Sequence, residues 1–522
     1  ALPLAWIPEQ DVGGKDNKRS DELRIRASNL ELAGLEGVRP LVAKLSPALG
    51  DVWRSTQPSG KINTLALDIP LQAADKTRFQ ASWSDLAWKQ WKLLPGAEHF
   101  SGTLSGSVEN GLLTASMKQA KMPYETVFRA PLEIADGQAT ISWLNNDKGF
   151  QLDGRNIDVK AKAVHARGGF RYLQPANDEP WLGILAGIST DDGSQAWRYF
   201  PENLMGKDLV DYLSGAIQGG EADNATLVYG GNPQLFPYKH NEGQFEVLVP
   251  LRNAKFAFQP DWPALTNLDI ELDFINDGLW MKTDGVNLGG VRASNLTAVI
   301  PDYSKEKLLI DADIKGPGKA VGPYFDETPL KDSLGATLQE LQLDGDVNAR
   351  LHLDIPLNGE LVTAKGEVTL RNNSLFIKPL DSTLKNLSGK FSFINGDLQS
   401  EPLTASWFNQ PLNVDFSTKE GAKAYQVAVN LNGNWQPAKT GVLPAAVNEA
   451  LSGSVAWDGK VGIELPYHAG ATYNVELNGD LKNVSSHLPS PLAKPAGEPL
   501  PVNVKVDGNL NSFELTGQAG AD

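Results

Sequence analysis

Hydrophobic and polar residues alternate with a period of two over most of the chain. Residues 268–274 place Leu, Ile, Leu and Phe at the even positions and acidic residues at the odd ones. The same alternation recurs in 425–431 and 502–506. Because successive side chains of a strand point to opposite faces, this pattern predicts an antiparallel sheet with one apolar and one polar face.

Prolines at the ends of four predicted strands divide the chain into copies of one unit. They are Pro70, Pro237, Pro356 and Pro466, each after an apolar residue and before Leu or Tyr. Turn signals of the Asn-Gly or Asp-Gly type begin 40, 39, 39 and 41 residues later, at positions 110, 276, 395 and 507. Such residues favour hairpin turns, which need positive φ. The constant spacing predicts a strand, turn and strand repeated four times.

Each copy also carries one short helical pattern upstream of its proline-ended strand. These patterns open at Pro40, Pro201, Pro329 and Pro444, and proline is well tolerated at the first helical position. We expect short amphipathic helices that cap a sheet edge. The intervals between the four prolines are 161, 128 and 115 residues, so the first copy contains an insertion of roughly 40 residues, including strands near 157–163.

The repeat predicts four units along the chain: 1–175 with the insertion, 176–300, 301–420 and 421–522. The last unit stops 15 residues after Asp507, although the corresponding distance in earlier copies is about 50 residues. We therefore expect the chain to be a segment of a longer repeat protein.

The apolar face of so much sheet must be covered, and the short helices are too few to cover it. The predicted fold class is mostly β: a long, repetitive, antiparallel, curled β-sheet forming a β-groove, with a few short capping helices. The alternative is a series of tandem β-sandwich modules. Modules are usually joined by exposed polar linkers, which the sequence lacks, so the continuous groove is favoured.

Composition excludes several classes of function. The 522 residues carry a formal charge of −16, which argues against nucleic-acid binding because that depends on cationic side chains. Zero cysteines exclude disulfides and thiolate chemistry. The longest apolar run, 181–188, is far shorter than the roughly 20 residues of a membrane span, and no secretory leader is visible at the amino terminus.

Catalytic and metal-binding patterns are missing from the sequence. The six histidines form no HExxH motif, and GxSxG is absent. Asp344, Asp346 and Asn348 resemble the start of a calcium loop, but Ala349 and Ile355 stand where Gly and Glu are required. We predict no catalytic residues, no metal and no cofactor, and therefore no enzyme. The tryptophans of 83–91 suggest carbohydrate binding or packing, and packing is favoured.

Two passages carry a resemblance to a known family. They are RYFPENLMGKDLVDYLSGAIQGG from Arg198 and LTNLDIELDFINDGLWMKTDGVNLGGVRASNLTAVIPDY from Leu265, within the repeated organisation described above. The whole chain resembles the AsmA-like proteins of the Gram-negative envelope. This resemblance implies a β-groove protein, anchored in the inner membrane by an N-terminal helix, that transports phospholipid across the periplasm toward the outer membrane. The chain lacks the anchor helix of that pattern.

The resemblance implies that this is a periplasmic segment of an inner-membrane-anchored protein, with phospholipids as ligands and possible protein partners in either membrane. Acyl chains would then lie along the apolar phase of the strands. The predicted lining residues are Leu65, Leu67, Ile270, Leu272, Phe274, Leu351, Leu353, Val427 and Val429. The alternative function is a structural or adhesive β-sandwich repeat protein of the cell envelope.

Overall fold

The computed structural model describes residues 4–7, 21–40, 43, 47–92, 94–378 and 381–520. The chain divides into two compact units. The first contains 1–256, 267–281 and 299–306, and the second contains 257–266, 282–298 and 307–522. Strands β13, β14 and β15 contribute residues to both units.

Strands make up most of the described chain. Those up to residue 256 are β1 (Leu4–Ile7), β2 (Glu22–Glu31), β3 (Ser59–Pro70), β4 (Arg78–Trp88), β5 (Ala97–Ser107), β6 (Asn110–Met122), β7 (Leu132–Asn146), β8 (Gly149–Ala161), β9 (Val164–Pro175), β10 (Trp181–Thr190), β11 (Ile217–Gly231) and β12 (Gln244–Phe256). The next are β13 (Leu265–Ile275), β14 (Gly278–Leu288) and β15 (Val291–Ile300).

The remaining strands belong to the second unit. They are β16 (Lys307–Pro317), β17 (Leu341–Asp344), β18 (Asp346–Pro356), β19 (Thr363–Ile377), β20 (Ser382–Ile394), β21 (Asp397–Ser400), β22 (Leu403–Trp407), β23 (Gln410–Glu420), β24 (Ala424–Trp435), β25 (Leu451–Gly453), β26 (Val455–Pro466), β27 (Thr472–Asp480), β28 (Val484–Ser486), β29 (Pro501–Asn509) and β30 (Phe513–Ala519).

The helices are short. The α-helices are α2 (Pro47–Thr56), α3 (Glu202–Met205), α4 (Lys207–Ala216), α5 (Val321–Phe325), α6 (Ala336–Glu340) and α7 (Ala445–Ala450). The longer of the other helical segments are η1 (Leu32–Val38), η3 (Gly193–Tyr199) and the π-helix η7 (Lys331–Gly335). None of the described helices is long and apolar enough to cross a membrane.

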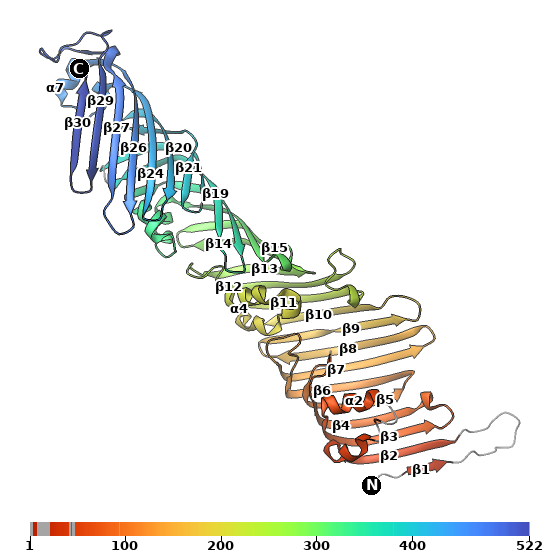
Figure 1. Cartoon of the computed structure of the whole chain (residues 1–522). Coiled ribbons are helices and arrows are strands. Elements are labelled where there is room, and N and C mark those ends of the chain that lie inside the picture. Colours follow the sequence, from red (N-terminus) through yellow and green to blue (C-terminus); the bar gives the residue numbers. More distant parts are fainter. Residues whose placement is uncertain are drawn as a thin grey trace. The chain divides into compact units, whose positions relative to one another are not determined.

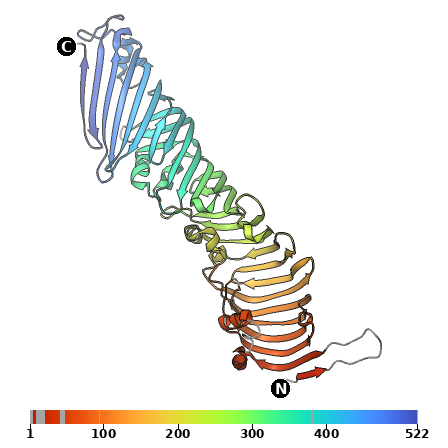
Figure 2. The same cartoon turned by 45° about the vertical axis from the view of Figure 1, so that its right-hand side comes forward.

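Strand pairing follows chain order and is antiparallel. In the first unit each strand from β1 to β12 pairs with the next one, so the strands lie side by side in Figure 1. In the second unit, β23, β24, β26, β27, β29 and β30 pair in that order, and Figure 2 shows these strands bending along their length. The sheet contains 28 strands, and β25 and β28 form a separate pair.

The fold-class prediction is therefore confirmed, since the described strands form one long antiparallel sheet rather than a series of sandwich modules. The core of the second unit consists mainly of side chains of the sheet, with Val321 of α5 packed against them. In the second unit, Leu403, Leu412 and Leu370 are 1%, 2% and 3% exposed although no second large sheet covers them. Because these buried side chains cluster with one another across several strands, we assign the apolar face to the inside of the curl.

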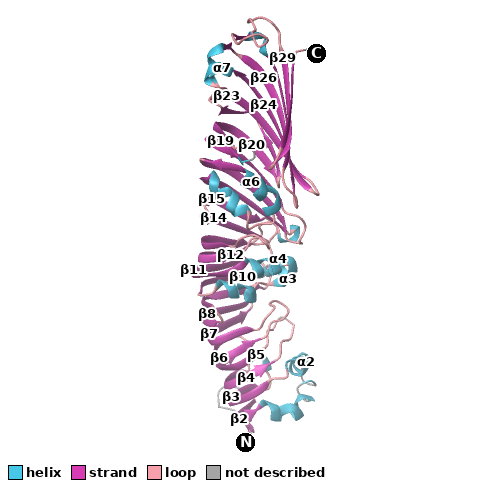
Figure 3. Ribbon diagram, turned by 90° about the vertical axis from the view of Figure 1, so that its left-hand side faces the viewer, coloured by secondary structure: helices cyan, strands magenta, loops and turns pink. Residues whose placement is uncertain are grey.

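The helix predictions agree with the structure where it is described. Pro201 and Pro444 directly precede α3 and α7, and Pro329 lies two residues before η7. The pattern from Pro40 lies partly outside the described residues, although α2 follows it. Figure 3 shows α2, α3 and α4 on one side of the strands of the first unit.

Two of the four turn predictions are right in position. Asn276 and Asn395 have φ of 52° and 53° in two-residue turns. Each also bonds to the residue 31 positions earlier: the Asn276 Oδ1 accepts from the Phe245 N–H at 2.9 Å, and the Asn395 Oδ1 accepts from the Ala364 N–H at 2.9 Å. This shared contact supports the repeat relation between the two copies.

The turn predictions at Asn110-Gly111 and Asp507-Gly508 are wrong, because these residues lie in strands. The first hairpin turns at residues 108–109, where the Ser107 hydroxyl accepts from the backbone N–H groups of Glu109 and Asn110. The last turns after Asn509, whose side chain accepts from the N–H groups of residues 511 and 512. The strand end predicted at Pro237 is also wrong, since β11 ends at Gly231.

Candidate functional site

The apolar face of the first unit is built from rows of directly paired residues that cross the strands. One row runs through Ala27, Leu65, Ala81, Leu104, Leu113, Ile141, Gly154, Phe170, Ile184, Tyr229 and Phe245. The next runs through Ile25, Leu67, Phe79, Gly106, Gly111, Trp143, Leu152, Tyr172, Leu182 and Gly231. The predicted residues Leu65 and Leu67 therefore sit in two neighbouring rows that contain no charged side chain.

The opposite face of the same strands is polar. One of its rows consists of Thr64, Ser82, Thr103, Thr114 and Thr140. Neighbouring hydroxyls bond across the strands, with 2.7 Å between Thr64 and Ser82 and 2.6 Å between Thr103 and Thr114. The two faces thus have sharply different chemistry, as the alternation of the sequence predicts.

The second unit repeats this division. An apolar row joins Phe416, Val429, Val461, Val475, Val506 and Leu515. A polar row on the other face joins Asp415, Asn430, Lys460, Glu476, Lys505 and Thr516. The Lys505 ammonium lies 3.4 Å from the Glu476 carboxylate, so charges on this face pair with each other.

The predicted lining residues of the second unit share its apolar face. Leu351 lies in a row with Ala312, Gly366 and Phe393, and Val427 and Val429 belong to adjacent rows. Leu351, Leu353 and Val429 are half-buried, whereas Val427 is 5% exposed. Their contact with lipid remains a prediction.

The apolar phase of β13 is covered more completely. Ile270 and Leu272 are 5% and 2% exposed, whereas Leu65 and Leu67 are half-buried. The ring of Phe274 lies 6.3 Å from that of Phe200, which connects η3 to α3. Leu209, Val210 and Leu213 of α4 are at most 1% exposed. Residues 193–216 therefore form a helical cover that contacts β11 and reaches β13 through Phe200, a feature that the period-two pattern did not reveal.

Arg129 connects this cover to the loop between β6 and β7. Its guanidinium pairs with Glu202 and, at 2.6 Å, with Asp211. Hydrogen bonds from Lys207 and Arg129 hold the pKa of the Asp211 carboxyl below its ordinary value. The loop itself is held to the sheet through Gln90, whose Oε1 accepts from the Glu125 N–H at 2.8 Å.

We expect Arg129→Ala to loosen the cover without unfolding the sheet. Partly exposed ion pairs contribute about 1 kcal/mol, so amides of residues 202–216 should exchange with deuterium about fivefold faster. Hydrogen-exchange mass spectrometry measures this rate. Arg167→Ala, which removes an ion pair to Asp158 on the polar face, is the matched control and should leave these amides unchanged.

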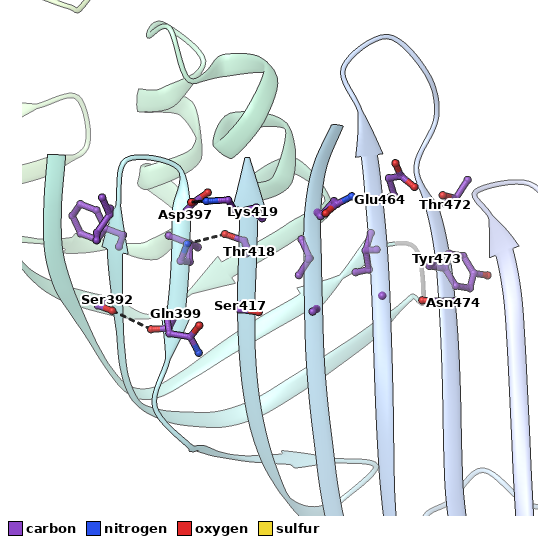
Figure 4. A pocket seen from close by; sticks show the side chains of 18 of the residues that line it. Ser392, Asp397, Gln399, Ser417, Thr418, Lys419, Glu464, Thr472, Tyr473 and Asn474 are labelled. Carbon is purple, nitrogen blue, oxygen red and sulfur yellow. Dashed lines mark hydrogen bonds and ion pairs between the residues drawn. The ribbon is translucent and has the colours of Figure 1, made fainter. Parts of the chain in front are cut away.

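A cavity of about 1010 Å³ lies on the polar face of the second unit. Its lining includes Ser392, Gln399 and Ser417 of the polar phase (Figure 4), and Val427 and Ile463 of the apolar phase. Although partial burial acts to raise it, hydrogen bonds from Lys419 and the Glu420 N–H hold the pKa of Asp397 below its ordinary value. Lys419 is paired in this way, so the cavity does not present it as a free cation.

The described residues contain no group of three or more His, Asp and Glu side chains that could hold a metal. His165 and His352 each face an aspartate, with 2.7 Å from His165 Nε2 to Asp158 and 2.8 Å from His352 Nδ1 to Asp311. Trp83 and Trp88 pack against Phe100, with ring centroids 5.8 and 5.1 Å away, in agreement with the packing interpretation.

Comparison with known proteins finds a family match and a near-identical relative. The family model described as YhdP protein matches residues 2–522. The intermembrane phospholipid transporter YhdP of Escherichia coli (strain K12) is 98% identical over 522 residues, which is 100% of this chain and 41% of that protein. The chain thus spans about two fifths of the length of this curated relative. No solved structure matches it.

Proposed function

Because the chain belongs to the YhdP family, we propose that its apolar face carries the acyl chains of phospholipids between the inner and outer membranes. The observation that supports this most directly is the uncharged rows through Leu65 and Leu67, which cross the first unit from β2 to β11 and remain half-buried. The name of the near-identical relative, a phospholipid transporter, agrees with this chemistry.

Apolar contact alone can hold an acyl chain, so no specific binding site for the head group is required. Each methylene removed from water contributes about 0.8 kcal/mol, so one tail is held firmly by apolar contact alone. Head groups would stay in water at the open side of the curl. Neighbouring strands are about 4.8 Å apart and present similar side chains, so a tail that advances by one strand meets nearly the same surroundings. Repetition therefore keeps the barrier to sliding low.

The position of the protein in the cell is part of the proposal. We expect this chain to be a periplasmic segment of a longer protein that an inner-membrane helix anchors in a Gram-negative envelope. Phospholipids are the proposed ligands, and proteins of either membrane are the proposed partners. A structural or adhesive role is less favoured, because sandwich modules would seal their apolar faces against each other, whereas Leu65, Leu67 and Phe79 on this face are only half-buried.

Site-specific photocrosslinking tests the proposal. We expect benzoyl-phenylalanine at Phe79, on the apolar face, to crosslink to phospholipid in the full-length protein in cells. The same probe at the neighbouring Gln80 points to the polar face and should not. Lipid attached to position 80 and absent from position 79 would contradict the assignment of the face. Mass spectrometry of the crosslinked peptide identifies the lipid.

A further inference from the structure

Glycines on the apolar face sit directly opposite aromatic residues of the next strand. Examples in the register are Gly111 with Trp143, Gly154 with Phe170, Gly366 with Phe393 and Gly508 with Tyr473. The pairs occur in both units. Glycine weakens a strand interior by roughly 0.5–1 kcal/mol relative to alanine, so a repeated placement there calls for a structural reason.

The reason is that each ring occupies the place of the missing side chain. A methyl group at Gly111 would lie 2.1 Å from the Cζ2 atom of Trp143, and one at Gly154 would lie 2.1 Å from the Cε1 atom of Phe170. At Gly366 and Gly508 the nearest ring atoms would be 2.7 and 2.8 Å away. Side chains of a strand normally stand nearly perpendicular to the sheet. These rings instead lean sideways over the neighbouring backbone.

The row through Gly106 and Gly111 shows how far the rings lean. In this row Phe79 on β4 and Trp143 on β7 flank the two glycines, three strand spacings or about 14 Å apart. Their ring centroids are nevertheless only 6.0 Å apart, at an interplanar angle of 20°. The two rings therefore extend toward each other across the glycines of β5 and β6, and cover the backbone there with a flat aromatic surface.

We propose that these glycines are positioning residues that keep the aromatic rings flat and so set the free width of the groove. This inference rests on the proposed function. An upright Trp143 would project into the concave side, where an acyl chain has to pass. A ring laid over glycine still offers apolar contact, but it leaves that space free. The half-buried state of Trp143, Phe170, Phe393 and Tyr473 agrees with rings that line an accessible surface.

The experiment compares Gly111→Ala, Trp143→Ala and the double variant in the full-length protein. Phospholipid transfer is measured between donor and acceptor vesicles of phosphatidylethanolamine and phosphatidylglycerol. We expect Gly111→Ala to push the ring upright and to slow transfer roughly tenfold, as a 1.4 kcal/mol barrier would. The double variant should transfer faster than Gly111→Ala alone, because it has no ring to obstruct the groove. Trp143→Ala shows by itself what loss of the ring's apolar contact does to transfer.

Thermal unfolding separates this role from simple packing. Trp143→Ala and the double variant both lose the ring contacts, so their melting temperatures should fall, although the double variant should transfer faster than Gly111→Ala. If transfer followed melting temperature across the three variants, or if the double variant stayed blocked, the positioning role would be refuted. Gly187→Ala is the control, because a methyl group there meets no atom within 4 Å on the polar face.

Failure of the proposed function has a different signature. If the wild-type protein transferred no phospholipid, both the proposed function and this inference would fail. Normal transfer by wild type and by Gly111→Ala alike would overturn only the inference about the glycines.

Discussion

Replacement of Leu65 and Leu67 together by aspartate is expected to stop phospholipid transfer while the sheet stays folded. Both side chains belong to uncharged rows of the apolar face and are half-buried. The new carboxylates can therefore turn toward water when no lipid is present. A passing acyl chain would have to displace that water. If desolvation adds about 2 kcal/mol to the barrier, passage slows about thirtyfold.

The same strand supplies the control for this prediction. Thr64→Asp with Ala66→Asp places two carboxylates on the polar face, among Ser82, Arg26 and Gln80. We expect normal transfer from this variant. Vesicle transfer and circular dichroism should be measured together for both variants. Equal transfer by the two double variants, with both folded, would exclude the apolar face as the lipid path.

The second large effect is expected from Asn373→Ala, which should destabilise the sheet locally by about 3 kcal/mol. Asn373 is 0% exposed and lies where β19 changes partner from β18 to β17. Its Nδ2 donates to the carbonyl oxygens of Asp344 and Asp346, both at 3.0 Å, and its Oδ1 accepts from the Arg371 N–H at 2.7 Å. Alanine would leave all three backbone groups without this partner.

Hydrogen exchange measures that effect better than global unfolding, because the chain contains two compact units. A local loss of about 3 kcal/mol corresponds to exchange roughly a hundredfold faster for amides of β17 and β18. Asn430→Ala removes an exposed hydrogen bond to Asp415 on the polar face and should change exchange little. A change below threefold in Asn373→Ala would show that water replaces the side chain at no cost.

The positions of two glycines explain why two of the turn predictions were wrong. Asn110-Gly111 and Asp507-Gly508 are typical hairpin dipeptides, yet both lie in strands. Gly111 lies beneath the ring of Trp143 and Gly508 beneath that of Tyr473, and these partners are 32 and 35 positions away. Only strand register brings each pair together. The turn predictions hold at Asn276 and Asn395, where each side chain also accepts a hydrogen bond from the backbone N–H 31 positions earlier.

The sequence by itself determined the period-two alternation, and with it an antiparallel sheet whose two faces differ in polarity. It also determined the turn positions at Asn276 and Asn395, whereas the four-unit repeat remains a prediction. The predicted lining residues of β3, β18 and β24 fall on one face for this reason, because alternation fixes the face of every residue in a strand once one is known.

Tertiary structure alone decided how accessible that face is along its length. Residues 193–216 contact β11 and reach β13 through Phe200, and Arg129 reaches them from a loop more than 70 positions earlier in the chain, so no local pattern could show this cover. Ile270 and Leu272 are buried, whereas Leu65 and Leu67 are half-buried. The curvature of the sheet is also decided by the tertiary structure. Alternation assigns a side chain to a face, but which side of the sheet becomes concave depends on contacts between strands that are distant in sequence, and those contacts exist only in the folded chain.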